Sequence, residues 1–226
     1  MRRALARGDL FDTAPREPTI YENGLVHAPG YLSLDQQQEL LADIDKALKD
    51  APLFQPTMPK TGKAFSVRMS NCGALGWVSD RDGGYRYQAT HPVTGRRWQK
   101  IPALALEAWQ KLAHYPVLPD ACLINFYEVN ARMGMHQDSD ELDLRAPVLS
   151  LSLGASCIFR FGGTERGGKT IGLTLASGDA LLLAGESRMA YHGVARIIPG
   201  TSPLSHTLIE GDGRINLTLR RVTRPS

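Results

Sequence analysis

The sequence predicts a mainly β member of the α+β class: a double-stranded β-helix, or jelly roll, preceded by a helical and loop-rich extension. Helical patterns occupy the chain before residue 118, and short apolar runs separated by turn residues follow it. Several short strands at such spacing are typical of a sandwich or barrel. With 226 residues, of which 42% are hydrophobic and 22% charged, the chain can build its own core.

Three segments are expected within one structural domain. Residues 1–20 form a flexible tail, residues 21–118 form the N-terminal extension, and residues 119–226 form the jelly-roll core. The tail begins with basic residues but lacks the apolar run of a signal peptide. No stretch approaches the roughly 20 apolar residues of a membrane span. The three cysteines are far apart and odd in number, as expected for reduced core thiols in a cytoplasmic protein.

Two helices are predicted in the extension. Residues 33–51 open with Ser33 and Gln36, which match a capping box, and apolar residues then recur on one helical face. Residues 101–116 place Pro102 at a helix start. These helices are expected to cover the outer face of the jelly roll.

The second half of the chain predicts strands within six runs. The SGDALLLAG segment indicates a tight turn followed by a buried strand. The six runs span residues 121–129, 146–154, 156–163, 170–185, 191–198 and 214–222.

The segment GMHQDSDEL places one histidine and three carboxylates within a few residues of one another. In an extended segment residues i and i+2 point the same way, so His136 and Asp138 are aimed at one point. His192, at the edge of a later strand, is the best third partner. A His-x-Asp pair followed by a distant His is the pattern of the facial triad that leaves open positions on iron. Zinc would suit the same ligands, and a hydrogen-bonded loop pair would also explain His136 and Asp138 alone.

The last strand, RINLTLR, alternates sharply between polar and apolar residues. Arg214, Asn216, Thr218 and Arg220 share one face, which would point two guanidinium groups into the barrel interior. Buried arginine is costly without a partner, and no carboxylate in the sequence is placed to pair with both. A solvated sheet face is the alternative. Together with the triad, the strand favours an arginine clamp for a dicarboxylate, as in a 2-oxoglutarate-dependent oxygenase.

Six segments in order make the chain resemble the AlkB family of iron- and 2-oxoglutarate-dependent nucleic-acid demethylases over roughly residues 50–221. They are SNCGALGW, PDACLINFY, HQDSDELDLRAPVLSLSLG, FRFGG, GESRMAYHG and RINLTLR.

The resemblance implies that His136, Asp138 and His192 bind iron(II) and that Arg214 holds the distal carboxylate of 2-oxoglutarate. It implies further cosubstrate contacts at Asn125, Tyr127, Asn216 and Arg220. The implied reaction consumes O2 and 2-oxoglutarate, hydroxylates an N-methyl group on a base, and releases formaldehyde, succinate and CO2.

The resemblance also implies how a base is recognised. The Gly-rich, aromatic stretch at residues 69–98 matches the family's nucleotide-recognition lid, with Trp77 and Tyr85 against a flipped base. Asp140 matches a position that meets the alkylated base, which is cationic in 1-methyladenine and 3-methylcytosine. Arg166 matches a position near substrate. Packing of Trp77 in the core and solvation of Asp140 are the alternatives, and Glu141 is expected to be a surface charge.

The expected partner is alkylated DNA, single- or double-stranded, with RNA as a second candidate, acted on by a monomer. The formal charge of +3 is compatible with a nucleic acid but does not establish one. A 2-oxoglutarate hydroxylase of protein or a small molecule is the alternative, and it would lack the Trp77–Tyr85 lid and Asp140. Departures from the family pattern, which bear on lesion preference, occur at Phe126, Asn130, Arg160 and Ile215.

Overall fold

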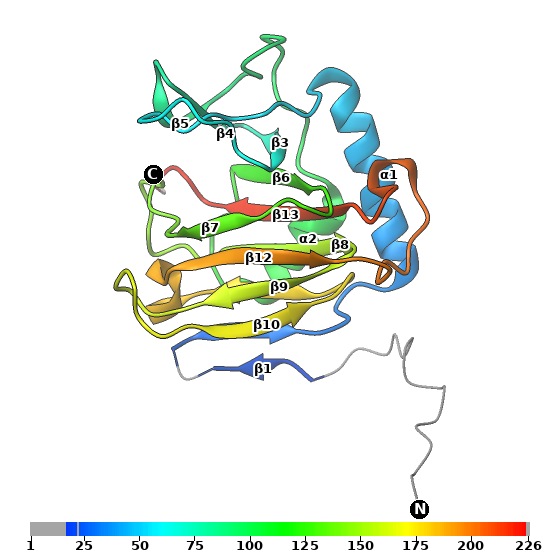
Figure 1. The fold of residues 1–226 in the computed structure, drawn as a ribbon, viewed down its shortest axis with the longest axis vertical. Coiled ribbons are helices and arrows are strands. Elements are labelled where there is room, and N and C mark those ends of the chain that lie inside the picture. The colour runs from blue at the N-terminus through cyan, green and yellow to red at the C-terminus, as the bar shows by residue number, and fades with distance from the viewer. Residues whose placement is uncertain (1–16, 22, 225–226) are drawn as a thin grey trace, which may run out of the picture.

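Two facing β-sheets form the body of the protein, as predicted for a jelly roll (Figure 1). The computed structural model describes residues 17–21 and 23–224. The larger sheet has seven strands in the order β1-β2-β11-β8-β13-β6-β3. In chain order these are β1 (Thr19–Ile20), β2 (Leu25–Ala28), β3 (Arg68–Gly73), β6 (Ala121–Tyr127), β8 (Val148–Gly154), β11 (Ala180–Leu183) and β13 (Arg214–Arg220).

The smaller sheet has four strands in the order β10-β9-β12-β7. Its strands are β7 (Met133–His136), β9 (Ser156–Phe161), β10 (Ile171–Leu175) and β12 (His192–Ile198). Apolar side chains from both sheets pack between them, among them Leu123, Leu181, Phe159 and Val194. This interior core leaves room for a site toward one end of the sandwich.

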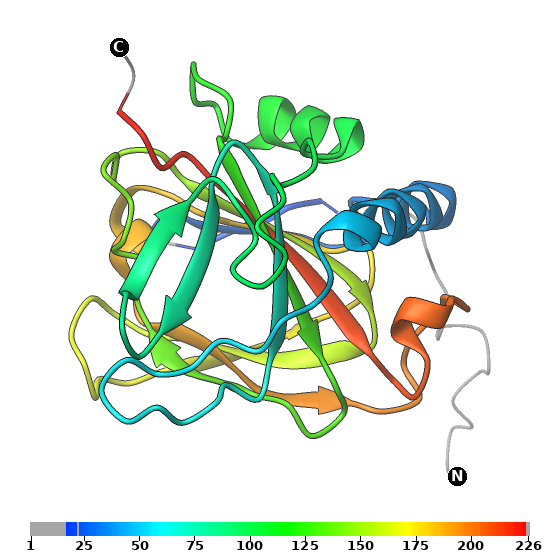
Figure 2. The same cartoon turned by 90° about the horizontal axis from the view of Figure 1, so that it is seen from above.

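Both predicted helices are present and pack on the outer face of the larger sheet (Figures 1 and 2). Helix α1 (Leu34–Asp50) begins with the predicted capping box, in which Ser33 and Gln36 bond each other's backbone amides. Such a cap is worth about 1 kcal/mol. Helix α2 (Ala103–Leu112) follows Pro102 and is shorter than the predicted span of residues 101–116. Two short 3-10 helices, η2 (Gly185–Met189) and η3 (Thr207–Ile209), lie within loops.

The extension contributes strands as well as helices. Strands β1, β2 and β3 join the larger sheet, with β1 pairing to β2 and β3 pairing to β6. Residues 1–16 of the predicted tail lie outside the described residues. Strands β4 (Gly76–Asp80) and β5 (Gly84–Gln88) form a separate hairpin, which we call the lid, at the end of the sandwich (Figure 2). Its turn uses Gly84 at φ 69°, a conformation that favours glycine.

Strand β13 alternates as predicted. Ile215, Leu217 and Leu219 are buried against the helices. The other face enters the space between the sheets, where Arg214 and Arg220 are also buried. In the antiparallel register Asn216 lies opposite Asn125 and Arg214 lies opposite Tyr127, so these side chains share the interior face.

The cysteines and the apolar character of the helices also bear on the expectations from the sequence. Cys72, Cys122 and Cys157 are buried and free, as predicted. Within the described ranges, no helix combines the length and the apolar character that a membrane crossing requires.

Candidate active site and metal centre

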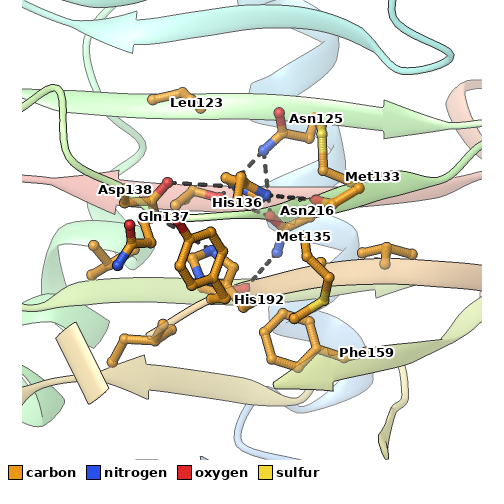
Figure 3. Close-up of a pocket in the computed structure, with 18 of the residues that line it drawn as sticks. Leu123, Asn125, Met133, Met135, His136, Gln137, Asp138, Phe159, His192 and Asn216 are labelled. Carbon is orange, nitrogen blue, oxygen red and sulfur yellow. Dashed lines mark hydrogen bonds and ion pairs between the residues drawn. The ribbon is translucent and has the colours of Figure 1, made fainter. Parts of the chain in front are cut away.

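A cavity of about 530 Å³ opens between the two sheets beneath the lid. Every residue that the sequence predicts for the site lines this cavity. Figure 3 shows His136, Asp138 and His192 gathered on one side of it, with Asn125 and Asn216 beside them. The site therefore combines side chains from both sheets, the lid and the loop after β7.

The two histidines meet because their strands pair. His136 ends β7 and His192 begins β12, and the two residues are directly opposite in the antiparallel register. Gly193 permits this approach, since a Cβ there would lie 2.6 Å from the Met133 carbonyl oxygen. Asp138 lies in the loop just past β7 rather than in the predicted extended segment. Even so, each histidine Nε2 lies 3.6 Å from a carboxylate oxygen of Asp138.

Hydrogen bonds fix which histidine nitrogen faces the cavity. Nδ1 of His136 lies 2.9 Å from the Gly134 carbonyl oxygen, and Nδ1 of His192 lies 2.9 Å from the Ala190 carbonyl oxygen. A carbonyl only accepts, so each Nδ1 donates and each Nε2 keeps its lone pair. Such a backbone bond orients a metal-ligating imidazole.

The electrostatics keep the three groups in their ligand forms. Burial lowers the pKa of His192 to about 4, so its imidazole is neutral at pH 7. Burial has the largest single effect and would raise the pKa of Asp138, but Arg220, with smaller contributions from His192, His136 and Arg188, more than offsets it and holds that pKa below its usual range. Asp138 Oδ2 is buried and has no hydrogen-bond partner among the described residues.

These donors fit iron(II). Two imidazole nitrogens and one carboxylate oxygen, all within 4.8 Å of one another, form the one cluster of potential metal ligands in the described part of the chain. An orphaned buried carboxylate oxygen is costly unless something binds it. Three ligands grouped on one side would leave further coordination positions open, as in the two-histidine, one-carboxylate triad.

Arg214 occupies a different part of the cavity. Its side chain is 1% exposed, and it donates to the carbonyl oxygens of Ala155 (3.0 Å) and Leu175 (3.4 Å) and to Ser152 Oγ (2.7 Å). Its Nε has no hydrogen-bond partner within the part of the chain that the structure describes. All its partners are neutral, so this buried cation lacks the counter-ion that would offset its desolvation.

A polar network lies on the same interior face. Asn216 Nδ2 donates to Ser150 Oγ at 2.6 Å, and Thr218 Oγ1 donates to Asn216 Oδ1 at 2.7 Å. Asn125 Nδ2 approaches Thr218 Oγ1 at 3.3 Å. Tyr127, opposite Arg214 in register, is 4% exposed, and burial raises the pKa of its hydroxyl, which therefore keeps its proton.

Arg220 differs from the sequence-based expectation. It faces the cavity, but Nη2 lies 2.6 Å from Asp138 Oδ1 and Nη1 lies 2.9 Å from Glu141 Oε1. The sequence predicts that the available carboxylates cannot pair with both arginines; the structure pairs Arg220 with two of them and gives Arg214 only neutral partners. The sequence does not show which carboxylates meet Arg220, because that depends on how the loop after β7 folds back over the end of β13.

The expectation for Glu141 is wrong. Its side chain is fully buried, not a surface charge, and it accepts hydrogen bonds from Arg188 Nη2 at 3.0 Å and from the Tyr87 hydroxyl at 2.5 Å. Burial has the largest single effect and would raise the pKa of Glu141, but Arg220, Tyr87 and Arg188 together more than offset it, so the pKa is lowered. Sequence reasoning missed Arg188 and Tyr87 as well, since neither belongs to a ligand pattern.

The structure brings the lid residues together. Trp77 and Tyr85 stack with ring centroids 5.6 Å apart and planes 21° from parallel. Trp77 is 9% exposed and donates from Nε1 to Asp140 Oδ2 at 2.8 Å, while Tyr85 is 51% exposed. Arg166, with its guanidinium 5.8 Å from the Tyr191 ring centre, completes this part of the cavity lining.

The family pattern "2OG-Fe(II) oxygenase superfamily" matches residues 24–220. The Alpha-ketoglutarate-dependent dioxygenase AlkB homolog of Caulobacter vibrioides is 45% identical over 98% of this chain and 97% of its own length. The chain belongs to the AlkB family of iron(II)- and 2-oxoglutarate-dependent dioxygenases. AlkB of Escherichia coli K12 is 41% identical over 81% of this chain and 84% of its own. The structure of OsALKBH1 superposes with a TM-score of 0.74 at 28% identity, covering 91% of this chain and all of that one.

Family membership settles the reaction class. The protein is an oxidative dealkylating dioxygenase that uses iron(II), O2 and 2-oxoglutarate. The His136–Asp138–His192 cluster is the candidate for its iron centre. More distant relatives are named for demethylation of DNA and of tRNA.

Proposed function

We propose that this AlkB-family dioxygenase removes N-linked alkyl groups from cationic bases such as 1-methyladenine and 3-methylcytosine. DNA is the primary substrate, and RNA is a second. The observation that carries the proposal is a single cavity holding the His136–Asp138–His192 cluster, the uncompensated Arg214 and an aromatic lid hydrogen-bonded to Asp140. Iron(II), O2 and 2-oxoglutarate, when bound, would supply the oxidation that hydroxylates the alkyl carbon, so that an N-methyl group is released as formaldehyde with succinate and CO2.

The histidines and Asp138 are proposed to hold the iron through His136 Nε2, His192 Nε2 and the Asp138 carboxylate. His136 is the most open of the three, with 39% of its side chain exposed. The iron therefore has a route to solvent and substrate. The backbone bonds to both Nδ1 atoms hold the imidazoles in place before any metal arrives.

Arg214 is proposed to bind one carboxylate of 2-oxoglutarate. A carboxylate would supply the missing counter-ion and accept from Nε, which has no protein partner. Asn125, Tyr127 and Asn216 border the same space and would donate further hydrogen bonds. Arg220 is held by Asp138, but its Nε also lacks a partner and remains a donor for the cosubstrate.

Asp140 is proposed to select cationic bases. Its Oδ2 accepts from Trp77, which fixes the carboxylate while Oδ1 stays available. A base must leave the duplex to reach a site beneath the lid. The indole of Trp77 and the ring of Tyr85 offer it a surface, and a cation over an indole gains about 0.5–2 kcal/mol. Arg166 is proposed to contact a neighbouring phosphate.

Two features of the whole chain complete the proposal. Every group named above comes from one chain, and we propose that the enzyme acts as a monomer, to be measured by light scattering in solution. Three free, buried thiols suit a reducing compartment, which favours the cytoplasm.

The test is an assay of formaldehyde and succinate with iron(II), O2 and 2-oxoglutarate. Its substrates are matched DNA and RNA oligonucleotides, single- and double-stranded, carrying 1-methyladenine, 3-methylcytosine, neutral 3-methylthymine or no lesion. We expect formaldehyde from the cationic lesions, in equal amount to the lesion-dependent succinate, and slower release from 3-methylthymine. Lesion-independent succinate without formaldehyde would contradict the proposal and favour a protein or small-molecule substrate.

A further inference from the structure

Five side chains, four of them buried and one partly buried, form a hydrogen-bonded cluster between the lid and the triad. We call it the Glu141 cluster, and its members are Tyr87, Asp138, Glu141, Arg188 and Arg220. Glu141 is its centre, because its two oxygens accept from Tyr87, Arg188 and Arg220. The cluster holds two carboxylates and two guanidiniums, so its charges balance without solvent.

Two hydrogen bonds from the cluster hold Asp138, one at its backbone and one at its carboxylate. Arg188 donates from Nη1 to the Asp138 backbone carbonyl at 2.6 Å, and Arg220 donates from Nη2 to Asp138 Oδ1 at 2.6 Å. Both guanidiniums are in turn held by the single carboxylate of Glu141. Glu141 thus sets the positions of the two guanidiniums that bond Asp138. Asp138 Oδ2 is left without a hydrogen-bond partner among the described residues.

The loop that carries Asp138 also forms hydrogen bonds to the lid. Trp77 on β4 and Tyr87 on β5 are directly opposite in the register of the hairpin. Their partners are the adjacent carboxylates Asp140 and Glu141: Trp77 Nε1 donates to Asp140, and the Tyr87 hydroxyl donates to Glu141. Burial raises the pKa of Tyr87, so this hydroxyl keeps its proton. One short loop therefore holds a cross-strand aromatic pair of the lid and the carboxylate of the triad.

We propose that Glu141 is a positioning residue that couples the docking of the lid to the orientation of Asp138, a role that rests on the iron site proposed above. Its charge holds Arg188 and Arg220 in the geometry that presents Asp138. Its bond to Tyr87 makes that geometry depend on the lid. Neutralising Glu141 would leave two buried guanidiniums competing for Asp138 alone and would loosen the lid at β5.

The chain provides a matched control in the same loop. Asp143 is buried and accepts from the Tyr115 hydroxyl and from Arg145 Nε at 3.1 Å. Like Glu141 it accepts from one tyrosine and from arginine, but its side-chain partners among the described residues are Tyr115 and Arg145 rather than Asp138 or the lid. Asp143→Asn therefore reports the cost of losing a buried loop carboxylate as such.

The experiment titrates cobalt(II) into metal-free protein without 2-oxoglutarate and records affinity and the ligand-field spectrum. Glu141→Gln is expected to weaken cobalt binding about 10- to 100-fold and to alter the spectrum, as loss of an outer partner of a ligand does. Tyr87→Phe keeps all charges, so its cobalt affinity should fall less, while KM for a 1-methyladenine oligonucleotide rises about tenfold with a smaller change in kcat. Asp143→Asn should match wild type in affinity, spectrum and KM.

Wild-type cobalt affinity and spectrum in Glu141→Gln would overturn the coupling, as would an equal loss in Asp143→Asn. If Glu141→Gln fails to fold, Tyr87→Phe decides alone, and an unchanged KM overturns the proposal. Wild-type protein assayed in parallel for formaldehyde release reports on the proposed function separately, so failure of the coupling and failure of the function are distinguishable.

Discussion

The two ends of strand β13 hold the same side chain in opposite surroundings. Arg214 and Arg220 lie on one face of the strand and both are buried. Arg220 is bonded to the carboxylates of Asp138 and Glu141. Arg214 is bonded only to carbonyl and hydroxyl oxygens. At one end the protein completes its own ion pair, and at the other it leaves a buried cation for a ligand.

This difference separates two uses of a buried arginine. A cation paired within the protein stabilises the fold and shapes its neighbour, so its removal leaves carboxylates unpaired. A cation without a counter-ion raises the energy of the ligand-free protein and is offset when an anion arrives. The two ends of β13 should therefore respond differently when their arginines are removed.

The largest effect is expected at the triad. His136→Ala, Asp138→Ala and His192→Ala should each abolish formaldehyde release and cobalt(II) binding, because two remaining ligands do not hold a labile divalent ion. The three variants should differ in stability. Asp138→Ala also strips Arg220 of a partner, so its melting temperature should fall below that of His136→Ala. Near-normal turnover at low iron in any of the three would remove that residue from the triad.

The second effect concerns stability at the two ends. Arg220→Ala should lower the free energy of unfolding by about 3–5 kcal/mol, because the Asp138 carboxylate then loses its guanidinium partner and Glu141 keeps only Arg188. Arg214→Ala leaves only neutral groups unpaired and should cost about 1–3 kcal/mol. Urea unfolding of both variants measures the contrast. Equal losses would mean that the two arginines do not differ as their contacts indicate.

The third effect tests the lid. Trp77→Ala should lower kcat/KM for a 1-methyladenine oligonucleotide roughly 5- to 150-fold, the loss of about 1–3 kcal/mol for one base-stacking ring. Because Trp77 is only 9% exposed, unfolding should also become easier by about 3–5 kcal/mol. Trp77→Phe separates these effects, since it keeps most of the packing but loses the Nε1–H bond to Asp140. If succinate formation without a lesion falls in parallel with lesion repair, the role of Trp77 is purely structural.

The smallest effect is expected at Arg166. Arg166→Ala should weaken oligonucleotide binding a few-fold and equally for all sequences, and should reduce the salt dependence of log Kd by about one phosphate contact. Fluorescence anisotropy across a salt series measures this. An unchanged slope would place Arg166 away from the nucleic acid.

Local pattern was enough to predict much of the fold. The capping box at Ser33 sets the start of α1, and the alternation in RINLTLR places Arg214 inside and Leu217 outside, because both depend only on near neighbours. The triad was also predictable, since His136 and Asp138 are two residues apart and His192 belongs to a recognisable turn-and-strand segment. In each of these features, the spacing of nearby residues in the sequence determines how their side chains are arranged.

The Glu141 cluster could not be predicted in this way. Glu141 meets partners that are 54, 47 and 79 residues away in the chain, on β5, in η2 and on β13. Nothing local distinguishes a buried glutamate from a solvated one, because the distinction lies in which guanidiniums the fold brings to it. The lid hairpin was similarly visible only as a Gly-rich aromatic stretch, without the register that pairs Trp77 with Tyr87.

Whether Arg214 binds a carboxylate of 2-oxoglutarate can be measured by titration. Calorimetric titration of 2-oxoglutarate into cobalt(II)-loaded protein, without O2, compares wild type, Arg214→Ala and Arg160→Ala, an exposed arginine bonded to Thr170. We predict that Arg214→Ala weakens binding roughly 30- to 4,000-fold, equivalent to about 2–5 kcal/mol for a lost buried charge pair, and that Arg160→Ala binds as wild type. Equal affinity in all three proteins would contradict this role of Arg214 and place the cosubstrate elsewhere in the cavity.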